Sequence, residues 1–304
     1  MKRATLFLGA FLATFLWGSA FPCIKIGYQW MNIASSDTGS QMLFAGMRFF
    51  VAGLLVLLVG SIGSKKVLVP QRESGRLSPW WILWLLALTQ TFLQYFFYYI
   101  GLAHVSGTKG SIMNAMGTLF TVLIGMIYFR NKPGICKMAG VGIGMSGVVV
   151  ACFSGIGKGV SWLGEGALLI SAVFIAIGNI VNKKASESQN PMLVTGWHLL
   201  LGGGMLVITG IGMDGFVEIA DIHSGMLMAY LIFISAAGFG IWSYLLRHNP
   251  VENVAIFMFL TPVFGTLLSS ILLREKMNQI VWISLIMVCL GIFMVQQEKP
   301  QKLE

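Results

Sequence analysis

Ionisable side chains are rare inside the long apolar segments of this 304-residue sequence, and the few found there are candidates for chemistry. Arg48 is the one basic residue clearly inside such a segment, and His198 is the one deeply placed histidine. A charge held in hydrocarbon costs about 3 kcal/mol. Arg48 could bind a substrate carboxylate, but we favour a packing role in which neighbouring backbone carbonyls satisfy its guanidinium. His198 could titrate near neutral pH, but we favour a hydrogen-bonded packing role.

Acidic side chains are missing from the same segments. No Asp or Glu lies deep within an apolar run, and Glu165, Glu252 and Glu275 stand at the ends of runs. A site that binds cations in exchange for protons needs a buried carboxylate. The sequence therefore favours a neutral, zwitterionic or anionic ligand over a cationic one.

Amide and aromatic side chains form a second candidate group. Gln90, Gln94 and Tyr98 are spaced four residues apart, which places them on one face of a helix. Such a stripe should face protein or water rather than lipid. The other embedded candidates are two amides, Asn114 and Asn179, and two rings, Trp17 and Trp242. Together these residues could form a mostly apolar pocket with a few converging polar groups.

One glycine motif is set aside. Residues 142–147 fit GxGxxG, but they lie inside an apolar run with no preceding strand, so a dinucleotide site is not expected. Gly140, Gly144 and Gly147 instead predict a smooth ridge for close helix packing.

Catalytic and metal chemistry find no support. Asp37-Thr38-Gly39 occurs once, without the second carboxylate that a shared proton requires. The four cysteines are Cys23, Cys136, Cys152 and Cys289, and no two are closely spaced. No set of nucleophile, base and orienting group can be assembled, so we expect no enzyme, no metal and no cofactor.

The composition places these residues in a bilayer. The sequence is 56% hydrophobic and 10% charged, with a mean hydropathy of +0.81. Ten apolar runs are long enough to cross the membrane as helices: 4–28, 40–61, 79–102, 108–129, 134–153, 162–182, 191–211, 225–246, 251–273 and 278–296. The net charge of +9 gathers at the ends of these runs, which predicts cytoplasmic N- and C-termini and no nucleic-acid partner.

An internal repeat divides the chain in two. The pattern of residues 98–132 recurs at 242–276: the end of an apolar run, a short turn with His, a second apolar run, then Arg-x-Lys. We therefore predict two five-helix repeats at 1–153 and 164–297, a linker at 154–163 and a polar tail at 298–304. Because five is odd, the second repeat enters the membrane inverted.

The sequence resembles the EamA-type members of the drug/metabolite transporter superfamily. The resemblance rests on three motifs, Trp17-Gly18-Ser19-Ala20-Phe21, Arg48-Phe49 and Thr261-Pro262-Val263-Phe264, followed by Arg274-Glu275. It implies an inverted-repeat carrier whose central cavity is lined by helices 1, 3, 4, 6, 8 and 9, and it adds Ser19 and Thr261 to the candidate site. Two positions depart from the family pattern, Thr118 and Asn131.

We therefore expect a secondary carrier in the bacterial inner membrane. It would export a small neutral, zwitterionic or anionic metabolite, often an amino acid in this family, by alternating access. Its partners would be the substrate and the lipid bilayer, as a monomer or homodimer. The rival within transport is an exporter of aromatic cations that uses Trp17, Tyr98 and Trp242 for cation–π contacts. An intramembrane enzyme and a structural membrane protein are the alternatives outside transport, and energy coupling stays open.

Overall fold

The computed structural model describes residues 3–63, 69–70, 79–129, 134–153, 161–249, 254 and 256–297. The predicted polar tail, most of the predicted linker, Asn131 and Glu252 lie outside these residues. The first helices are α1 Arg3–Trp30, α2 Thr38–Gly63, α3 Pro79–Leu86, η1 Ala87–Leu93, α4 Gln94–His104, α5 Gly107–Asn114, α6 Met116–Phe129 and α7 Ile135–Cys152. They are followed by η2 Trp162–Gly166, α8 Ala167–Ser188, α9 Pro191–Gly212, α10 Ile222–His248, η3 Ile256–Phe259, α12 Leu260–Leu272 and α13 Gln279–Gln297.

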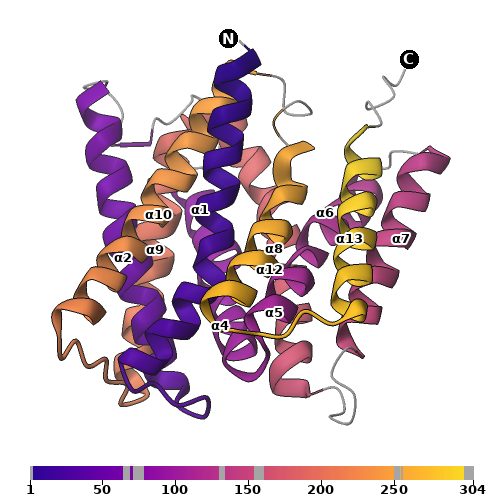
Figure 1. The fold of residues 1–304 in the computed structure, drawn as a ribbon. Coiled ribbons are helices and arrows are strands. Elements are labelled where there is room, and N and C mark those ends of the chain that lie inside the picture. The colour runs from indigo at the N-terminus through magenta and orange to yellow at the C-terminus, as the bar shows by residue number, and fades with distance from the viewer. Residues whose placement is uncertain are drawn as a thin grey trace.

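The described part of the chain is all-helical, as predicted, and forms one bundle (Figure 1). Among the described residues, seven helices are long and apolar enough to cross a membrane: Ala4–Trp30, Thr38–Ile62, Gly107–Tyr128, Ile135–Cys152, Trp162–Glu187, Pro191–Gly212 and Ile222–Leu245. Two shorter apolar helices are Phe257–Leu272 and Gln279–Val295. The predicted segment 79–102 is occupied by α3, η1 and α4. Helix α1 continues through Pro22.

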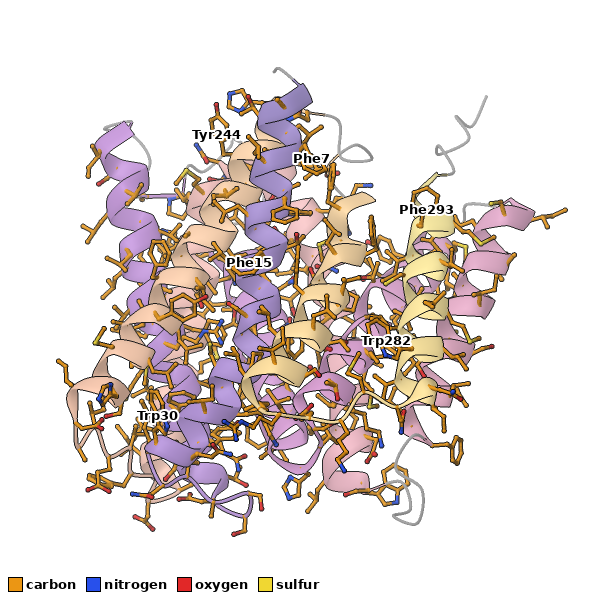
Figure 2. All side chains as sticks on the ribbon, viewed as in Figure 1. Phe7, Phe15, Trp30, Tyr244, Trp282 and Phe293 are labelled. Atoms are coloured by element: carbon orange, nitrogen blue, oxygen red, sulfur yellow. The ribbon has the colours of Figure 1, made fainter. Side chains whose placement is uncertain are left out.

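The outer surface of the bundle carries large apolar side chains (Figure 2). Phe7 is 53% exposed, Trp30 49%, Trp282 44% and Phe293 40%. An outer surface with so many exposed large apolar side chains would be unfavourable in water but suits contact with lipid. With the apolar helices, it identifies the chain as a multi-pass membrane protein.

Two helix pairs pack closely because glycines line their contacts. A Cβ added to Gly46 of α2 would lie 2.5 Å from the Val207 backbone nitrogen of α9, and one added to Gly203 of α9 would lie 2.4 Å from that of Phe50. Helices α7 and α13 pack in the same way, since a Cβ on Gly140 would lie 2.9 Å from the Gly291 carbonyl. The predicted glycine ridge on α7 is confirmed as a packing surface.

Like α2–α9 and α7–α13, the contacts of α1 and α8 join the two parts of the chain. Helix α1 packs against α10 and α12, whereas α8 packs against the α3–η1–α4 segment and against α6. If the helices are numbered by the predicted segments, helix 1 meets helices 8 and 9, while helix 6 meets helices 3 and 4. The contacts are therefore reciprocal: the first helix of each half packs against the third and fourth helices of the other.

The two ends of the bundle are named here by the segments that lie at them. Helix α1 begins and α13 ends at one end, which we call the termini end (Figure 1). The short turn between α4 and α5 lies at the opposite end, which we call the turn end (Figure 1).

Three predicted segments lose regular α-helical geometry near candidate residues. The π-helix η1 contains Gln90. Helices α5 and α6 are separated at Ala115, directly after Asn114. The 3-10 helix η3 passes into α12 just before Thr261. Such irregular turns in a helix are often found at functional sites.

Candidate functional site

An aromatic cluster joins α1 to α10. The Trp17 ring centroid lies 5.2 Å from that of Trp242 and 5.4 Å from that of Phe239. The absence of a side chain at Gly238 permits this approach, because a Cβ there would lie 2.6 Å from Trp17 Nε1. Trp17 Nε1 is buried and has no hydrogen-bond partner.

The residues that follow Trp17 attach α1 to its neighbours. Gly18 lies against α12, where a Cβ would be 2.9 Å from the Gly265 nitrogen. The Ser19 hydroxyl donates to the Leu16 carbonyl at 2.8 Å and shares a 2.8 Å hydrogen bond with the Tyr230 hydroxyl of α10. In the Trp-Gly-Ser motif, the side chains of Trp17 and Ser19 therefore contact α10, while the glycine between them packs against α12.

A chain of amides and hydroxyls connects η1, α8 and α6. Gln90 Nε2 donates to Asn179 Oδ1 at 3.1 Å, and Asn179 Nδ2 donates to Thr121 Oγ1 at 3.0 Å. Thr121 in turn donates to the Gly117 carbonyl at 2.6 Å. Gln90 and Asn179 are therefore in direct contact although they come from different halves of the chain.

Arg48 is buried among side-chain hydroxyls rather than the backbone carbonyls that we expected. Its Nε donates to Ser235 Oγ of α10 at 2.7 Å, and its Nη1 donates to the Tyr99 hydroxyl of α4 at 3.1 Å. The ring of Tyr99 lies 5.8 Å from that of Tyr98, which also faces Phe21 at 6.0 Å. Tyr98 and Arg48 thus belong to one cluster.

His198 has the hydrogen-bonded position that we favoured from the sequence. Its Nδ1 shares a 2.8 Å hydrogen bond with the Thr91 hydroxyl of η1, and its ring lies 6.0 Å from that of Phe239. Phe239 therefore bridges His198 and Trp17. Asn114 and Thr261 are not joined to the other candidates by a described contact.

Buried polar atoms without partners are concentrated in the candidate residues. Six such side-chain atoms occur among the described residues: Trp17 Nε1, Gln41 Oε1, Gln90 Oε1, Gln94 Oε1, Thr261 Oγ1 and Ser269 Oγ. Buried polar groups are normally paired, and leaving one unpaired costs about 1–3 kcal/mol. Four of the six atoms, those of Trp17, Gln90, Gln94 and Thr261, belong to candidate residues. A surface cavity lined by Trp30, Asp221 and His223 contains none of the candidates.

Charged residues at the turn end form a cluster that the sequence reasoning missed. Lys25 Nζ donates to the carbonyls of Leu102 at 3.1 Å and Val105 at 2.7 Å, at the C-terminal end of α4. The Glu275 carboxylate accepts from the backbone N–H of Gly107 at 2.7 Å and of Thr108 at 2.8 Å, at the start of α5. A cation therefore binds the negative end of one helix dipole and an anion binds the positive end of the next.

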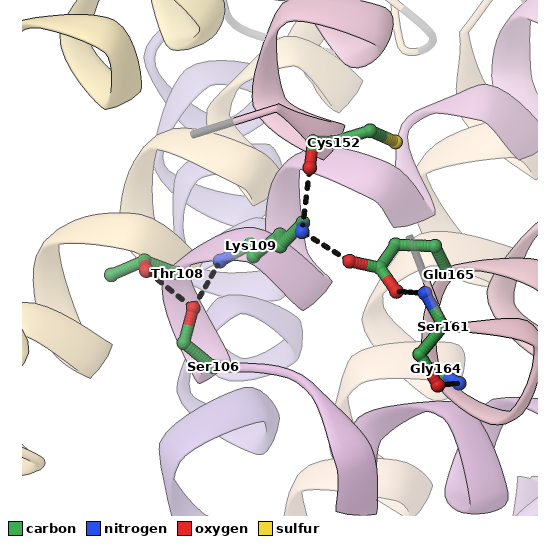
Figure 3. Close-up of polar contacts among 7 residues, drawn as sticks. All are labelled: Ser106, Thr108, Lys109, Cys152, Ser161, Gly164 and Glu165. Atoms are coloured by element: carbon green, nitrogen blue, oxygen red, sulfur yellow. Dashed lines mark hydrogen bonds and ion pairs between the residues drawn. The ribbon is translucent and has the colours of Figure 1, made fainter. Parts of the chain in front are cut away.

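An ion pair, drawn in Figure 3, joins α5 to η2. Lys109 of α5 pairs with Glu165 of η2 and donates to the Cys152 carbonyl at the end of α7 at 2.9 Å. Glu165 also accepts from the Ser161 backbone N–H at 2.9 Å. We call Lys25, Glu275, Lys109 and Glu165 the latch. The sequence signal was opposite charges at the ends of apolar runs, which we used only to orient the chain and to note that buried carboxylates are missing.

The fold and these interior polar groups define a multi-pass helical protein of the membrane. The chain belongs to the EamA-like transporter family, which it matches over residues 5–153 and again over 162–296. The family assignment confirms the resemblance and makes the chain a membrane transporter rather than an enzyme.

Relatives extend over nearly the whole chain. A probable amino-acid metabolite efflux pump of Escherichia coli is 25% identical over 93% of this chain and 92% of its own length. The uncharacterized transporter YvbV of Bacillus subtilis is 27% identical over 99% of this chain and 94% of its own. A solved crystal structure matches with a TM-score of 0.68 at 16% identity, covering 96% of both chains, and so shares the fold.

Proposed function

We propose that this transporter is a secondary carrier of ten membrane-spanning helices, arranged as two inverted five-helix repeats at 1–153 and 164–297. The observation that carries the proposal is the reciprocal packing of α1 and α8, each against the third and fourth helices of the other half. The two separate family matches also support it. In such an arrangement one half can rock against the other around a site between them.

The substrate site in this proposal is a central cavity between the halves. Trp17, Gln90, Gln94 and Thr261 contribute the polar atoms that lack a protein partner. Asn179 contacts Gln90, Trp242 contacts Trp17, and Phe239 connects His198 to Trp17. The proposed site also includes Ser19, Arg48, Tyr98 and Asn114, which lies at the break between α5 and α6. A mostly apolar enclosure with a few polar groups is typical of small-molecule sites.

Alternating access requires each end of the carrier to open in turn. The latch connects α1, the α4–α5 turn, η2 and the loop after α12. We infer that these contacts hold the turn end closed. The positive-inside pattern favours the cytoplasm for the termini end, so the turn end would face outward, and the bacterial relatives favour the inner membrane.

The function that we propose is export of a small amino-acid-like metabolite. The name of the Escherichia coli relative supports an amino-acid-like substrate, and the absence of Asp and Glu from the interior of the apolar runs disfavours cations. Purified protein in proteoliposomes should exchange labelled amino acids against an internal amino-acid pool. Absence of exchange with every amino acid, organic acid and dye tested would contradict a carrier function.

A second candidate is an exporter of aromatic cations. The cluster of Trp17, Trp242 and Phe239 favours it, because the faces of aromatic rings attract cations. The same proteoliposomes loaded with a fluorescent aromatic cation separate the two candidates. Dye efflux that amino acids do not inhibit would support the second candidate.

A further inference from the structure

Arg48 is a buried cation for which the chain supplies no buried anion. It is 4% exposed and lies ten residues into α2, roughly 15 Å along the helix at about 1.5 Å per residue. Every Asp and Glu of the sequence stands in a loop, in a tail or near the end of an apolar run. Among the described residues, no carboxylate pairs with Arg48. A charge buried without a counter-ion is strongly unfavourable.

The groups around Arg48 orient its guanidinium without neutralising it. Ser235 and Tyr99 are neutral hydroxyls and accept from Nε and Nη1. Nη2 donates to no described residue. The Phe49 ring centroid lies 4.8 Å from the guanidinium carbon, and the Tyr95 ring stands 4.0 Å from that of Phe49. The guanidinium therefore packs against aromatic rings and keeps N–H donors that no described residue accepts.

A carboxylate is the group that this arrangement lacks. A guanidinium presents its donors as a planar fork that matches the two oxygens of a carboxylate. Both hydroxyl partners of Arg48 come from helices of the proposed cavity, α4 and α10. We propose that Arg48 binds the carboxylate of the transported substrate, which rests on the carrier function proposed above.

This assignment narrows the substrate class. The chain offers no carboxylate for the ammonium group of an amino acid, but the unpaired amide oxygens of Gln90 and Gln94 can accept from it. Zwitterionic amino acids and simple organic acids therefore fit the site. Amines without a carboxylate would be repelled by Arg48 and would leave its charge unpaired.

The test compares acids with their uncharged analogues. Thermal unfolding of the purified protein is measured with the twenty amino acids and a series of two- to six-carbon organic acids, and then with the corresponding amides and amines. Some carboxylates should raise the melting temperature and their amides should not, because only a bound ligand stabilises the folded state. Equal stabilisation by acid and amide, or none by any carboxylate, would overturn the assignment.

Two variants test whether Arg48 is the residue that binds the carboxylate. Arg48→Gln should weaken carboxylate binding by about thirtyfold or more, the scale expected when a buried charge pair loses one partner. Arg48→Lys should retain part of the binding, because it keeps the charge and loses the fork. If carboxylate binding is unchanged in a folded Arg48→Gln protein, the assignment is overturned. If that variant does not fold, the comparison of acids with amides in the parent protein tests the assignment.

Two further measurements distinguish a substrate carboxylate from an inorganic anion and from an uncharged substrate. If sodium chloride raises the melting temperature as much as any carboxylate does, Arg48 binds an inorganic anion and the proposal is overturned. In proteoliposomes, transport of amines or amides alone would overturn the carboxylate assignment while the carrier function stands. Absence of all transport would instead contradict the carrier function.

Discussion

Removing the charge of Glu275 should open the turn end of the bundle. The backbone turns sharply before this residue, because Arg274 adopts a left-handed conformation with φ of 54°. The turn directs the carboxylate to the two amides at the start of α5, at 2.7 and 2.8 Å. Glu275→Gln keeps one accepting oxygen and loses the charge and the second acceptor.

The size of the effect follows from these two bonds. A hydrogen bond to a charged group contributes about 1.5–3 kcal/mol, and partial exposure of Glu275 reduces this value. We therefore expect the closed state to lose about 1–2 kcal/mol, which raises the population of the open state roughly 5- to 30-fold. Lys25→Ala should act in the same direction because it releases the carbonyls of α4.

Labelling of a cysteine beneath the latch measures this population. Ser269 is fully buried, and its hydroxyl oxygen would lie 2.6 Å from a Cβ on Gly107. A membrane-impermeant maleimide should react with Ser269→Cys several-fold faster when Glu275→Gln is added. Glu187→Gln, an exposed change in the last turn of α8, serves as the control. An unchanged labelling rate in folded Glu275→Gln and Lys25→Ala proteins would refute the latch.

Three other predictions concern packing, the site and the Lys109–Glu165 ion pair. Gly203→Val should lower the melting temperature, because the added side chain clashes with α2 at a cost of about 1–3 kcal/mol. The control Gly212→Ala should not, because its Cβ would meet no atom within 4 Å. Equal melting temperatures of the two variants would contradict the close α2–α9 contact. Gln90→Leu should leave Asn179 Oδ1 without its donor and slow transport, with Gln29→Leu at an exposed position as the control; unchanged transport would remove Gln90 from the site. Glu165→Gln should raise Ser269→Cys labelling, and reversal of the pair by Lys109→Glu with Glu165→Lys should restore part of the closure.

The sequence predicted an all-helical membrane protein but not which helices contact each other. Hydropathy locates membrane helices because hydrocarbon offers no alternative partner for the backbone. The small residues of α7 likewise indicated a packing ridge, which the contact with Gly291 confirms. The π-helix around Gln90 could not be predicted, because its residues carry no local signal for an extra residue in a turn; in the fold it packs against α9 and α8.

The candidate site could be predicted only in part. Polar residues in apolar runs are visible in the sequence, and four of them carry buried polar atoms without partners. The partners of Arg48 come from α4 and α10, and Glu275 binds a turn far earlier in the chain. Contacts across such separations have no periodic signature, so charges at helix ends could not be recognised as a latch.

The central claim is that the two halves enter the membrane in opposite directions, and paired cysteine labelling tests it most directly. Ser106, in the α4–α5 turn, and His248, at the end of α10, are exposed and occupy matching turns of the two repeats. With the exposed Cys136 replaced by Ser, single cysteines at these positions are treated with an impermeant maleimide in intact cells and in inverted vesicles. Labelling of Ser106→Cys from outside and His248→Cys only from inside is the predicted result. Labelling of both from the same side would contradict the inverted repeat and the carrier derived from it.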